Sequence, residues 1–297
     1  MERVGSKAEA RKTVADAHAE HKTVALVPTM GALHDGHLAL VRAACARAEY
    51  VVVSVFVNPT QFAPGEDYET YPRDIDHDMD LLAAEGVDLA FTPSAAHMYA
   101  GDAGVTVDPG PLGARWEGEV RPGHFTGVAT VVTKLLSIVR PDVAYFGEKD
   151  YQQLQVVRRA VADLDLAVTV TPHPVVRDRD GLALSSRNVH LSAEERVAAR
   201  AVPAALEAVA EALAWGERDA RALEWAMTDV LAGEPSLAID YVAVVDPATL
   251  EPLDAVDRAA RALVAARIGP TRLIDNCELL PPAAAGEPAP AHRKGSE

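Results

Sequence analysis

Two histidines, His34 and His37, stand three residues apart shortly after an apolar run at Val24–Val27. Pro28 and Gly31 break that run, and the apolar residues that follow have helical spacing, at Leu38, Val41 and Cys45. The pattern predicts a buried strand, a sharp turn and a helix whose N-terminus suits phosphate. Both histidines would lie on one face of the first helical turn, where they could stabilise a polyphosphate as its α-phosphorus is attacked.

The same spacing has other interpretations. An HxxH pair can be a metal site, or two solvated residues of a loop. The strand before the pair and the helix after it favour the polyphosphate interpretation, and Gly36 between the histidines would let a ligand approach the backbone closely.

Further polar side chains follow other apolar runs. Asn58 and Gln61 come after a β-branched run, and their amides can read the hydroxyl and carboxylate of a small substrate, although a plain proline turn is an alternative. Arg121 and His124 stand in a Gly-rich loop before a predicted helix. That loop is equally compatible with an anion site and with a simple capping role.

Cationic and hydroxyl side chains recur later in the chain. Lys149 at a predicted helix start would oppose the helix dipole, which a phosphate between them would explain, and Gln153 lies one turn along. Ser185, Ser186 and Arg187 have the composition of a phosphate clamp, although a polar linker is the plainer interpretation.

Two acidic residues, Asp76 and Asp78, open another predicted helix. They could hold Mg²⁺ on a nucleotide through one or two carboxylates. Acidic residues in a first turn also simply suit the helix dipole.

Composition limits the class of protein. The chain has 297 residues, 49% of them hydrophobic and 24% charged, which is typical of a globular enzyme-sized protein. The net charge of −16 argues against a nucleic-acid partner. The two cysteines, Cys45 and Cys277, do not indicate a disulfide framework. We find no signal-peptide pattern and no membrane-spanning run, so a cytoplasmic protein is expected.

Strands and helices are predicted to alternate over the first part of the chain. Besides the unit around His34, strands are expected at Tyr50–Val57, Val87–Phe91, Val143–Phe146 and Val168–Thr171, and helices up to about residues 16–20 and at Ile75–Glu85, Gly127–Val139 and Asp150–Leu164. This alternation predicts an α/β fold, a Rossmann-like doubly wound parallel sheet over residues 1–175.

The character of the sequence changes after about Pro174. A capping box at Ser192 and Glu195 predicts a long Ala-rich helix, followed by a second helix at about Arg218–Leu231 and by strands at Ile239–Val245 and Ala262–Ile268. We therefore expect a smaller α+β domain over residues 176–282. Residues 283–297 are rich in Pro, Ala and Gly and are expected to be a disordered tail.

The order of the motifs is more specific than any one of them. HxGH, FVNPTQF, YPRD, RPGHFTGV, FGEKDYQQ and LSSRN follow one another over about residues 27–188. This arrangement closely resembles the pantothenate synthetase (pantoate–β-alanine ligase) family of the HxGH nucleotidyltransferase superfamily, over about residues 1–280. The family resemblance implies condensation of pantoate with β-alanine at the expense of Mg-ATP, through a pantoyl adenylate.

The resemblance also implies roles for the motif residues. His34 and His37 would stabilise the triphosphate, while Lys149, Ser185, Ser186 and Arg187 would neutralise phosphates. Gly147 and Asp150 would lie near the ribose and adenine, and Met30 near the reacting carboxyl. Pantoate would be held by Gln61 and Gln153, Asn58 would lie near both small substrates, and Arg121 and His124 would shape the loop. The resemblance also places the magnesium-binding carboxylate at about residues 76–78. Position 77 is His where some relatives have an acid, which leaves open the carboxylate that holds Mg²⁺, with Asp78 favoured over Asp76.

Two other functions remain compatible with HxGH alone. One is a plain nucleotidyltransferase that joins a nucleotide to a phosphorylated substrate, and the other is a non-catalytic nucleotide-binding or regulatory protein. The NPTQF and SSRN segments favour the ligase, and the presence of both histidines with Lys149 and Arg187 argues against a non-catalytic protein. The resemblance further implies a homodimer formed through the N-terminal domain, with no nucleic-acid or membrane partner.

Overall fold

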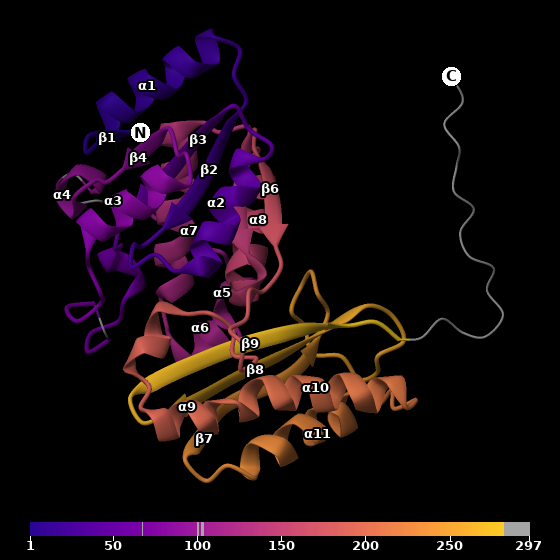
Figure 1. Ribbon diagram of the computed structural model, residues 1–297. Coiled ribbons are helices and arrows are strands. Elements are labelled where there is room, and N and C mark those ends of the chain that lie inside the picture. Colours follow the sequence, from indigo (N-terminus) through magenta and orange to yellow (C-terminus); the bar gives the residue numbers. More distant parts are fainter. Residues whose placement is uncertain (67, 100, 102–103, 282–297) are drawn as a thin grey trace.

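The computed structural model describes residues 1–66, 68–99, 101 and 104–281. The first part of the chain builds a six-stranded sheet in the order β1-β4-β3-β2-β5-β6, and its hydrogen-bonded pairs all run parallel (Figure 1). Its strands are Glu2–Val4, Val24–Thr29, Tyr50–Val55, Leu89–Phe91, Val143–Gly147 and Thr169–His173, for β1 to β6. The doubly wound parallel sheet predicted from the sequence is confirmed.

Helices cover both faces of this sheet, as the unbroken apolar strands require. On one side pack α1 (Lys7–Ala19), α7 (His124–Val139) and α8 (Tyr151–Asp163), and on the other α2 (Asp35–Cys45) and α3 (Ile75–Ala84). Short helical segments not predicted from the sequence are α4 (Ala95–Met98), α5 (Pro111–Ala114), α6 (Glu117–Val120), η1 (Pro59–Gln61) and η2 (Glu148–Asp150).

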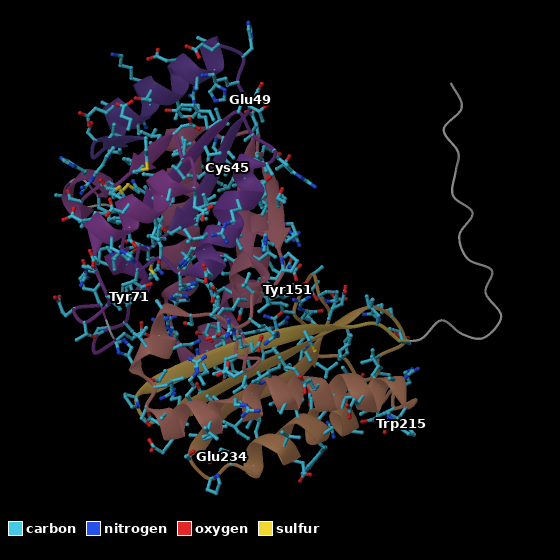
Figure 2. All side chains as sticks on the ribbon, in the orientation of Figure 1. Cys45, Glu49, Tyr71, Tyr151, Trp215 and Glu234 are labelled. Atoms are coloured by element: carbon cyan, nitrogen blue, oxygen red, sulfur yellow. The ribbon has the colours of Figure 1, made fainter. Side chains whose placement is uncertain are left out.

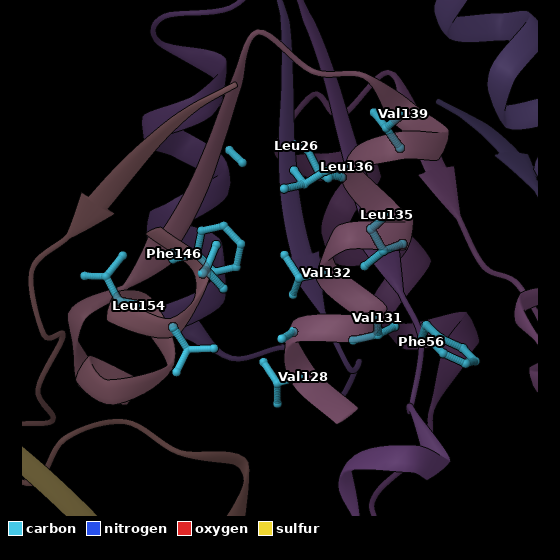
Figure 3. Close-up of a cluster of buried hydrophobic side chains, with 14 of the residues drawn as sticks. Leu26, Phe56, Val128, Val131, Val132, Leu135, Leu136, Val139, Phe146 and Leu154 are labelled. Carbon is cyan, nitrogen blue, oxygen red and sulfur yellow. The ribbon is translucent and has the colours of Figure 1, made fainter. Parts of the chain in front are cut away.

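Successive residues of a strand point to opposite faces, which divides the core in two. Leu26 of β2 joins the cluster beneath α7, whereas Ala25 and Val27 join the cluster beneath α2. Figure 3 shows the α7 side of this core, where Leu26 and Phe146 face a row of α7 side chains comprising Val128, Val131, Val132, Leu135 and Leu136. This packing fixes the start of α7 at His124, and with it the preceding loop that contains Arg121.

The C-terminal part contains a three-stranded antiparallel sheet, β7-β8-β9, over Leu237–Val245, Ala260–Ile268 and Thr271–Leu279. α10 (Ala201–Ala214) and α11 (Ala220–Ala232) pack along one face of it (Figure 1). Residues of its other face, among them Leu263, join the core cluster of the first sheet. The two sheets therefore share a packed contact, and residues of one can support the site of the other.

The long helix predicted after Ser192 is wrong in its length. The capping box of Ser192 and Glu195 is present, but α9 ends at Ala199 and a new helix begins at Ala201. Pro203 has no N–H to donate to the carbonyl of Ala199, four residues earlier, so the helical ladder is interrupted one turn before the proline. Strands β1 and β9 were not predicted, and the predicted tail at residues 283–297 lies outside the described residues.

Strand β2 continues through Pro28, where the sequence predicted its end. It pairs with β3 from Val24 to Thr29, but with β5 only at Ala25 and Leu26. The carbonyl of Val24 faces β5 and that of Thr29 faces β3, so alternation directs the backbone of Pro28 toward β5. Beyond Leu26, β2 and β5 are no longer paired, at the point where the strand order reverses.

No helix in the described ranges is long and apolar enough to cross a membrane.

Candidate active site

A cavity lies at the carboxyl edge of the first sheet, where β2 and β5 separate. It is lined by Pro28 and Thr29 of β2 and by Tyr145, Phe146 and Gly147 of β5. Most of the sequence-predicted residues line it as well, namely Met30, His34, His37, Asn58, Gln61, Arg121, His124, Lys149, Asp150, Gln153, Ser185, Ser186 and Arg187. Asp76 and Asp78 are not among its lining residues.

The turn after β2 is shaped by a buried carboxylate. The Asp78 side chain accepts hydrogen bonds from the backbone N–H of Ala32 at 3.0 Å and of Leu33 at 2.8 Å. Both Gly31 and Ala32 have positive φ, and a Cβ at Gly31 would lie 2.8 Å from an Asp78 oxygen. Burial raises the pKa of Asp78, while these two N–H donors favour the charged form. Asp78 therefore fixes the backbone that leads into His34.

His34 and His37 stack with their ring centroids 4.0 Å apart. His34 is the N-cap of α2, and its Nδ1 accepts the Gly36 N–H at 3.1 Å, so its proton belongs on Nε2. Burial, followed by the Lys149 charge, lowers the pKa of His34 to about 4, and burial with His34 as neighbour lowers that of His37 to about 3. Two neutral rings with N–H donors thus sit at a helix N-terminus.

His37 has an unusual ring nitrogen. Its Nδ1 is buried and has no hydrogen-bond partner within the described part of the chain. A buried polar atom without a partner costs free energy, which distinguishes His37 from His34, whose Nδ1 accepts the Gly36 N–H.

Amide side chains form the opposite part of the wall. Asn58 is buried and donates from Nδ2 to Gln61 Oε1 at 3.1 Å, while its own Oδ1 accepts from the Tyr99 hydroxyl at 2.7 Å. This fixes the Gln61 amide so that Nε2 lies 3.1 Å from Met30 Sδ. A thioether is a weak acceptor, so the Gln61 amide would form a stronger hydrogen bond to a carboxylate or hydroxyl oxygen of a ligand than it does to Met30 Sδ. Tyr99 is one of the groups that hold Asn58 in place, and sequence reasoning did not identify it, because it lies 41 residues from Asn58.

The Arg121 and His124 side chains contact the segment that contains Gln61 and Glu66. The Arg121 guanidinium binds both oxygens of Glu66, at 2.8 and 2.7 Å. His124 has Nδ1 2.8 Å from the Gln61 carbonyl oxygen and Nε2 3.2 Å from Arg121. Burial and then Arg121 lower the pKa of His124 to about 4, so the neutral ring donates from Nδ1 and accepts at Nε2. The pair fixes the backbone of Gln61, and Glu66 already balances the Arg121 charge.

The cationic side of the cavity comes from two segments. Lys149 lies in η2 directly after β5, with its Nζ 3.5 Å from Asp150 Oδ1. The Ser185 hydroxyl accepts the Arg187 N–H at 3.3 Å and so caps η3, which spans Ser186–His190. The Arg187 guanidinium lies 5.9 Å from the ring centroid of Tyr71. Lys149, Ser185, Ser186 and Arg187 therefore line one cavity although two separate segments contribute them.

The two glutamines at the start of α8 have different surroundings. Gln153 lines the cavity, one turn from Lys149. Gln152 is buried and donates to the carbonyls of Leu112 and Arg115, each at 2.8 Å. Gln152 thus ties the α5 region to α8.

The residues predicted to hold magnesium do not fit a metal site. Both oxygens of Asp78 already accept backbone N–H groups, and Asp76 is exposed on the first turn of α3. In the part of the chain that the structure describes, no group of three or more His, Cys, Asp or Glu side chains is arranged to hold a metal ion. The geometry gives Asp78 a positioning role in the β2–α2 turn.

Comparison with known proteins identifies relatives over most of the chain. The family model described as pantoate-beta-alanine ligase matches residues 2–278. A pantothenate synthetase of Rubrobacter xylanophilus is 54% identical over 268 residues, which cover 88% of this chain and 92% of the relative. One of Thermotoga neapolitana is 50% identical and covers 90% of this chain and 96% of the relative.

Solved structures agree with the sequence relatives. The crystal structure of pantothenate synthetase from Thermus thermophilus superposes with a TM-score of 0.90 at 50% identity, covering 95% of this chain and all of that one. A pantoate-beta-alanine ligase of Francisella tularensis, complexed with beta-gamma ATP and beta-alanine, gives 0.78 at 31% identity over 96% of this chain. Together with the matching family model, these findings show that the chain belongs to the pantoate–β-alanine ligase family.

Proposed function

We propose that the site joins pantoate to β-alanine by way of a pantoyl adenylate, using ATP and releasing AMP and pyrophosphate. The observation that carries the proposal is the convergence on one cavity of two neutral histidines, the cations Lys149 and Arg187, and the amide of Gln61. The histidines and the cations suit a triphosphate, and the Gln61 amide suits a small hydroxy acid. The relative from Francisella tularensis was solved with an ATP compound and β-alanine, which supports the same substrates here.

In this proposal the nucleotide lies between the histidines and the cations. His34 and His37 donate to the triphosphate, and Lys149, Ser185, Ser186 and Arg187 neutralise its charge. Gly147 and Asp150 contact the ribose and adenine, in the gap where β2 and β5 have separated. Residues 1–175 then form the nucleotide- and pantoate-binding domain, and residues 176–282 form a lid domain.

Pantoate occupies the amide side of the cavity. Gln61 and Gln153 hold its hydroxyl and carboxylate, Asn58 lies near both the pantoate and the β-alanine pockets, and Met30 packs near the reacting carboxyl. Arg121 and His124 act through the Gln61 carbonyl, which both groups contact.

In the first step a pantoate carboxylate oxygen attacks the α-phosphorus of ATP. A new P–O bond forms, the bond from the α-phosphorus to the bridging oxygen breaks, and pyrophosphate leaves with the electron pair. Negative charge increases on the phosphate oxygens during attack, and the N–H donors of His34 and His37, held neutral by burial, stabilise it without reorganising. Lys149 stabilises the leaving group.

In the second step the amine of β-alanine, after losing a proton, attacks the acyl carbon of the adenylate. The C–N bond forms, the C–O bond to the phosphate breaks, and AMP leaves. Nothing in this sequence of steps requires an acyl-enzyme nucleophile. Enclosure of the adenylate in the cavity protects it from hydrolysis.

ATP enters as its magnesium complex, with the ion carried on the phosphates. The Asp76 and Asp78 carboxylates do not fit a site for that ion. A homodimer formed through the N-terminal domain is part of the proposal, and gel filtration with light scattering tests it.

The test of the reaction is AMP release from Mg-ATP and pantoate, with and without β-alanine. AMP in bulk only with β-alanine, together with pantothenate, supports the two-step ligase. Pyrophosphate without free AMP would instead indicate a nucleotidyltransferase with another acceptor. A folded protein that turns over no ATP would contradict catalysis of this kind.

A further inference from the structure

A buried asparagine of the second sheet holds the turn that contains Lys149. Asn276 of β9 is 3% exposed, and its Nδ2 donates to the carbonyl oxygens of Glu148 and Lys149, each at 2.9 Å. Both protons of one amide are thus used on two successive carbonyls of η2. A single side chain from the second sheet therefore fixes the peptide groups before and after Lys149.

Asn276 is itself oriented by a buried arginine. The Nε of Arg261, on β8, donates to Asn276 Oδ1 at 2.7 Å, which determines which end of the amide faces η2. The same guanidinium donates to Glu148 Oε2 at 3.2 Å and lies 4.1 Å from the ring centroid of Tyr151. Figure 2 shows Tyr151 where the two parts of the molecule meet. Arg261 is 6% exposed, so the contact is desolvated and its geometry is tightly determined.

The adjacent residue of β9 supports the other cationic segment. Asp275 is buried and forms a two-point ion pair with Arg177, at 2.5 and 3.1 Å. Arg177 bridges to Ala183, immediately before the segment that contains Ser185 and Arg187. Successive residues of one strand thus reach both segments of the cationic side of the cavity.

We propose that Asn276, oriented by Arg261, is a positioning residue for Lys149, so that the second sheet is part of the nucleotide site without touching the nucleotide. The inference rests on the proposed role of Lys149. The backbone of η2 has no side-chain cap of its own, and its place is set by these two hydrogen bonds from β9. Loss of either would let Lys149 move relative to the phosphates.

The test compares Asn276→Ala with Lys149→Ala in steady-state turnover, with ATP and pantoate titrated separately. Single-turnover formation of pantoyl adenylate is measured for the same variants. We expect kcat/KM for ATP to fall by about 10- to 100-fold in Asn276→Ala, the range for misplacing a group that supports a site. KM for pantoate should not change. In the double variant the Asn276→Ala substitution should have no further effect, because the side chain it positions is absent.

The matched control is Thr228→Val, which removes a hydrogen bond within α11, from the hydroxyl to the Glu224 carbonyl. It should leave kcat/KM for ATP unchanged. A normal ATP titration in Asn276→Ala, or a full additional loss in the Lys149→Ala background, would overturn the inference. If Lys149→Ala itself forms the adenylate normally, the proposed role of Lys149 fails instead.

Should Asn276→Ala fail to fold, Arg261→Lys provides the same test. Lysine keeps a cation near Tyr151 but lacks the fork that joins Asn276 to Glu148. The same fall in kcat/KM for ATP is expected, with KM for pantoate unchanged. A wild-type ATP titration in Arg261→Lys would overturn the inference.

Discussion

The two sides of the cavity are built in different ways. The histidine side belongs to one sheet, where Asp78 and the N-terminus of α2 hold His34 and His37 as neutral, partly buried rings. The cationic side has a partly exposed Lys149 supported from a second sheet by Asn276. One side is fixed within its own sheet, and the other depends on how two sheets are packed together.

This difference follows from the charge of the groups on each side of the cavity. A neutral ring costs less free energy to bury than a charged group does, so the histidine side can be preorganised inside a single core. A cation at a turn requires solvent or a counter-charge until a phosphate arrives, so it stays nearer the surface and needs support from outside. Substitutions on the two sides should therefore differ in whether they affect stability or catalysis.

The largest expected effect lies on the cationic side. Lys149→Ala should lower the rate of adenylate formation by about 100-fold or more, the scale for losing a group that stabilises developing charge, with little loss of stability. Single-turnover formation of pantoyl adenylate measures it, and Lys22→Ala, at an exposed surface pair, is the control. An unchanged rate in the folded variant would refute the assignment.

The histidine side should respond through stability as well. Asp78→Asn places an amide donor against the Ala32 or Leu33 N–H, and a buried unpaired donor costs about 1–3 kcal/mol. We expect a lower free energy of unfolding in urea together with slower adenylation, because the turn leading to His34 shifts. Asp76→Asn, on the exposed face of the same helix, should change neither. Recovery of Asp78→Asn at high Mg²⁺ would instead support a metal-ligand role.

The amide wall between the two sides should show a smaller, substrate-specific effect. Gln61→Ala removes a donor near the pantoate carboxyl, so KM for pantoate should rise on the order of tenfold while the ATP titration and the fold stay unchanged. Initial rates at varied pantoate measure this. A wild-type pantoate titration would count against the role of Gln61.

The smallest effect concerns pH. The pKa values of His34 and His37, lowered to about 4 and about 3, predict no histidine titration in the adenylation rate between about pH 8 and pH 5. If the adenylation rate showed an apparent pKa near 6.5 that disappeared when His34 or His37 was replaced, the rings would not be neutral over this range.

Stability should nevertheless depend on pH through His124. Its pKa is about 4 in the folded chain, below the ordinary value of 6.5, so the unfolded chain binds more protons in that window. The contribution of His124 to the free energy of unfolding is therefore fully present above pH 6.5 and is lost as the pH falls toward 4. In His124→Asn, which keeps a donor for the Gln61 carbonyl, this slope should diminish. An identical slope would show that other groups cause it.

The sequence predicted the histidine side better than the cationic side. Periodicity located the strands and helices around His34 because they are continuous apolar runs with clear breakers. The motif order also indicated which residues line the cavity. The support for Lys149 was missed because Asn276 is 127 residues away on β9, a strand in which polar and apolar residues come in pairs and do not alternate. That Asp78 accepts the Ala32 and Leu33 N–H groups could not be predicted, because sequence does not show which donors a buried carboxylate accepts.

Pro28 makes the crevice between β2 and β5 an internal sheet edge. Past Leu26 the backbone of β2 offers β5 the carbonyl of Pro28 but no matching N–H, so the two strands cannot close into a continuous ladder. For the same reason the addition of an extended segment of another chain as a strand is disfavoured there, because one of the hydrogen bonds it needs has no donor. The proline thus reserves the centre of the sheet for small molecules and protects the exposed edge from strand invasion.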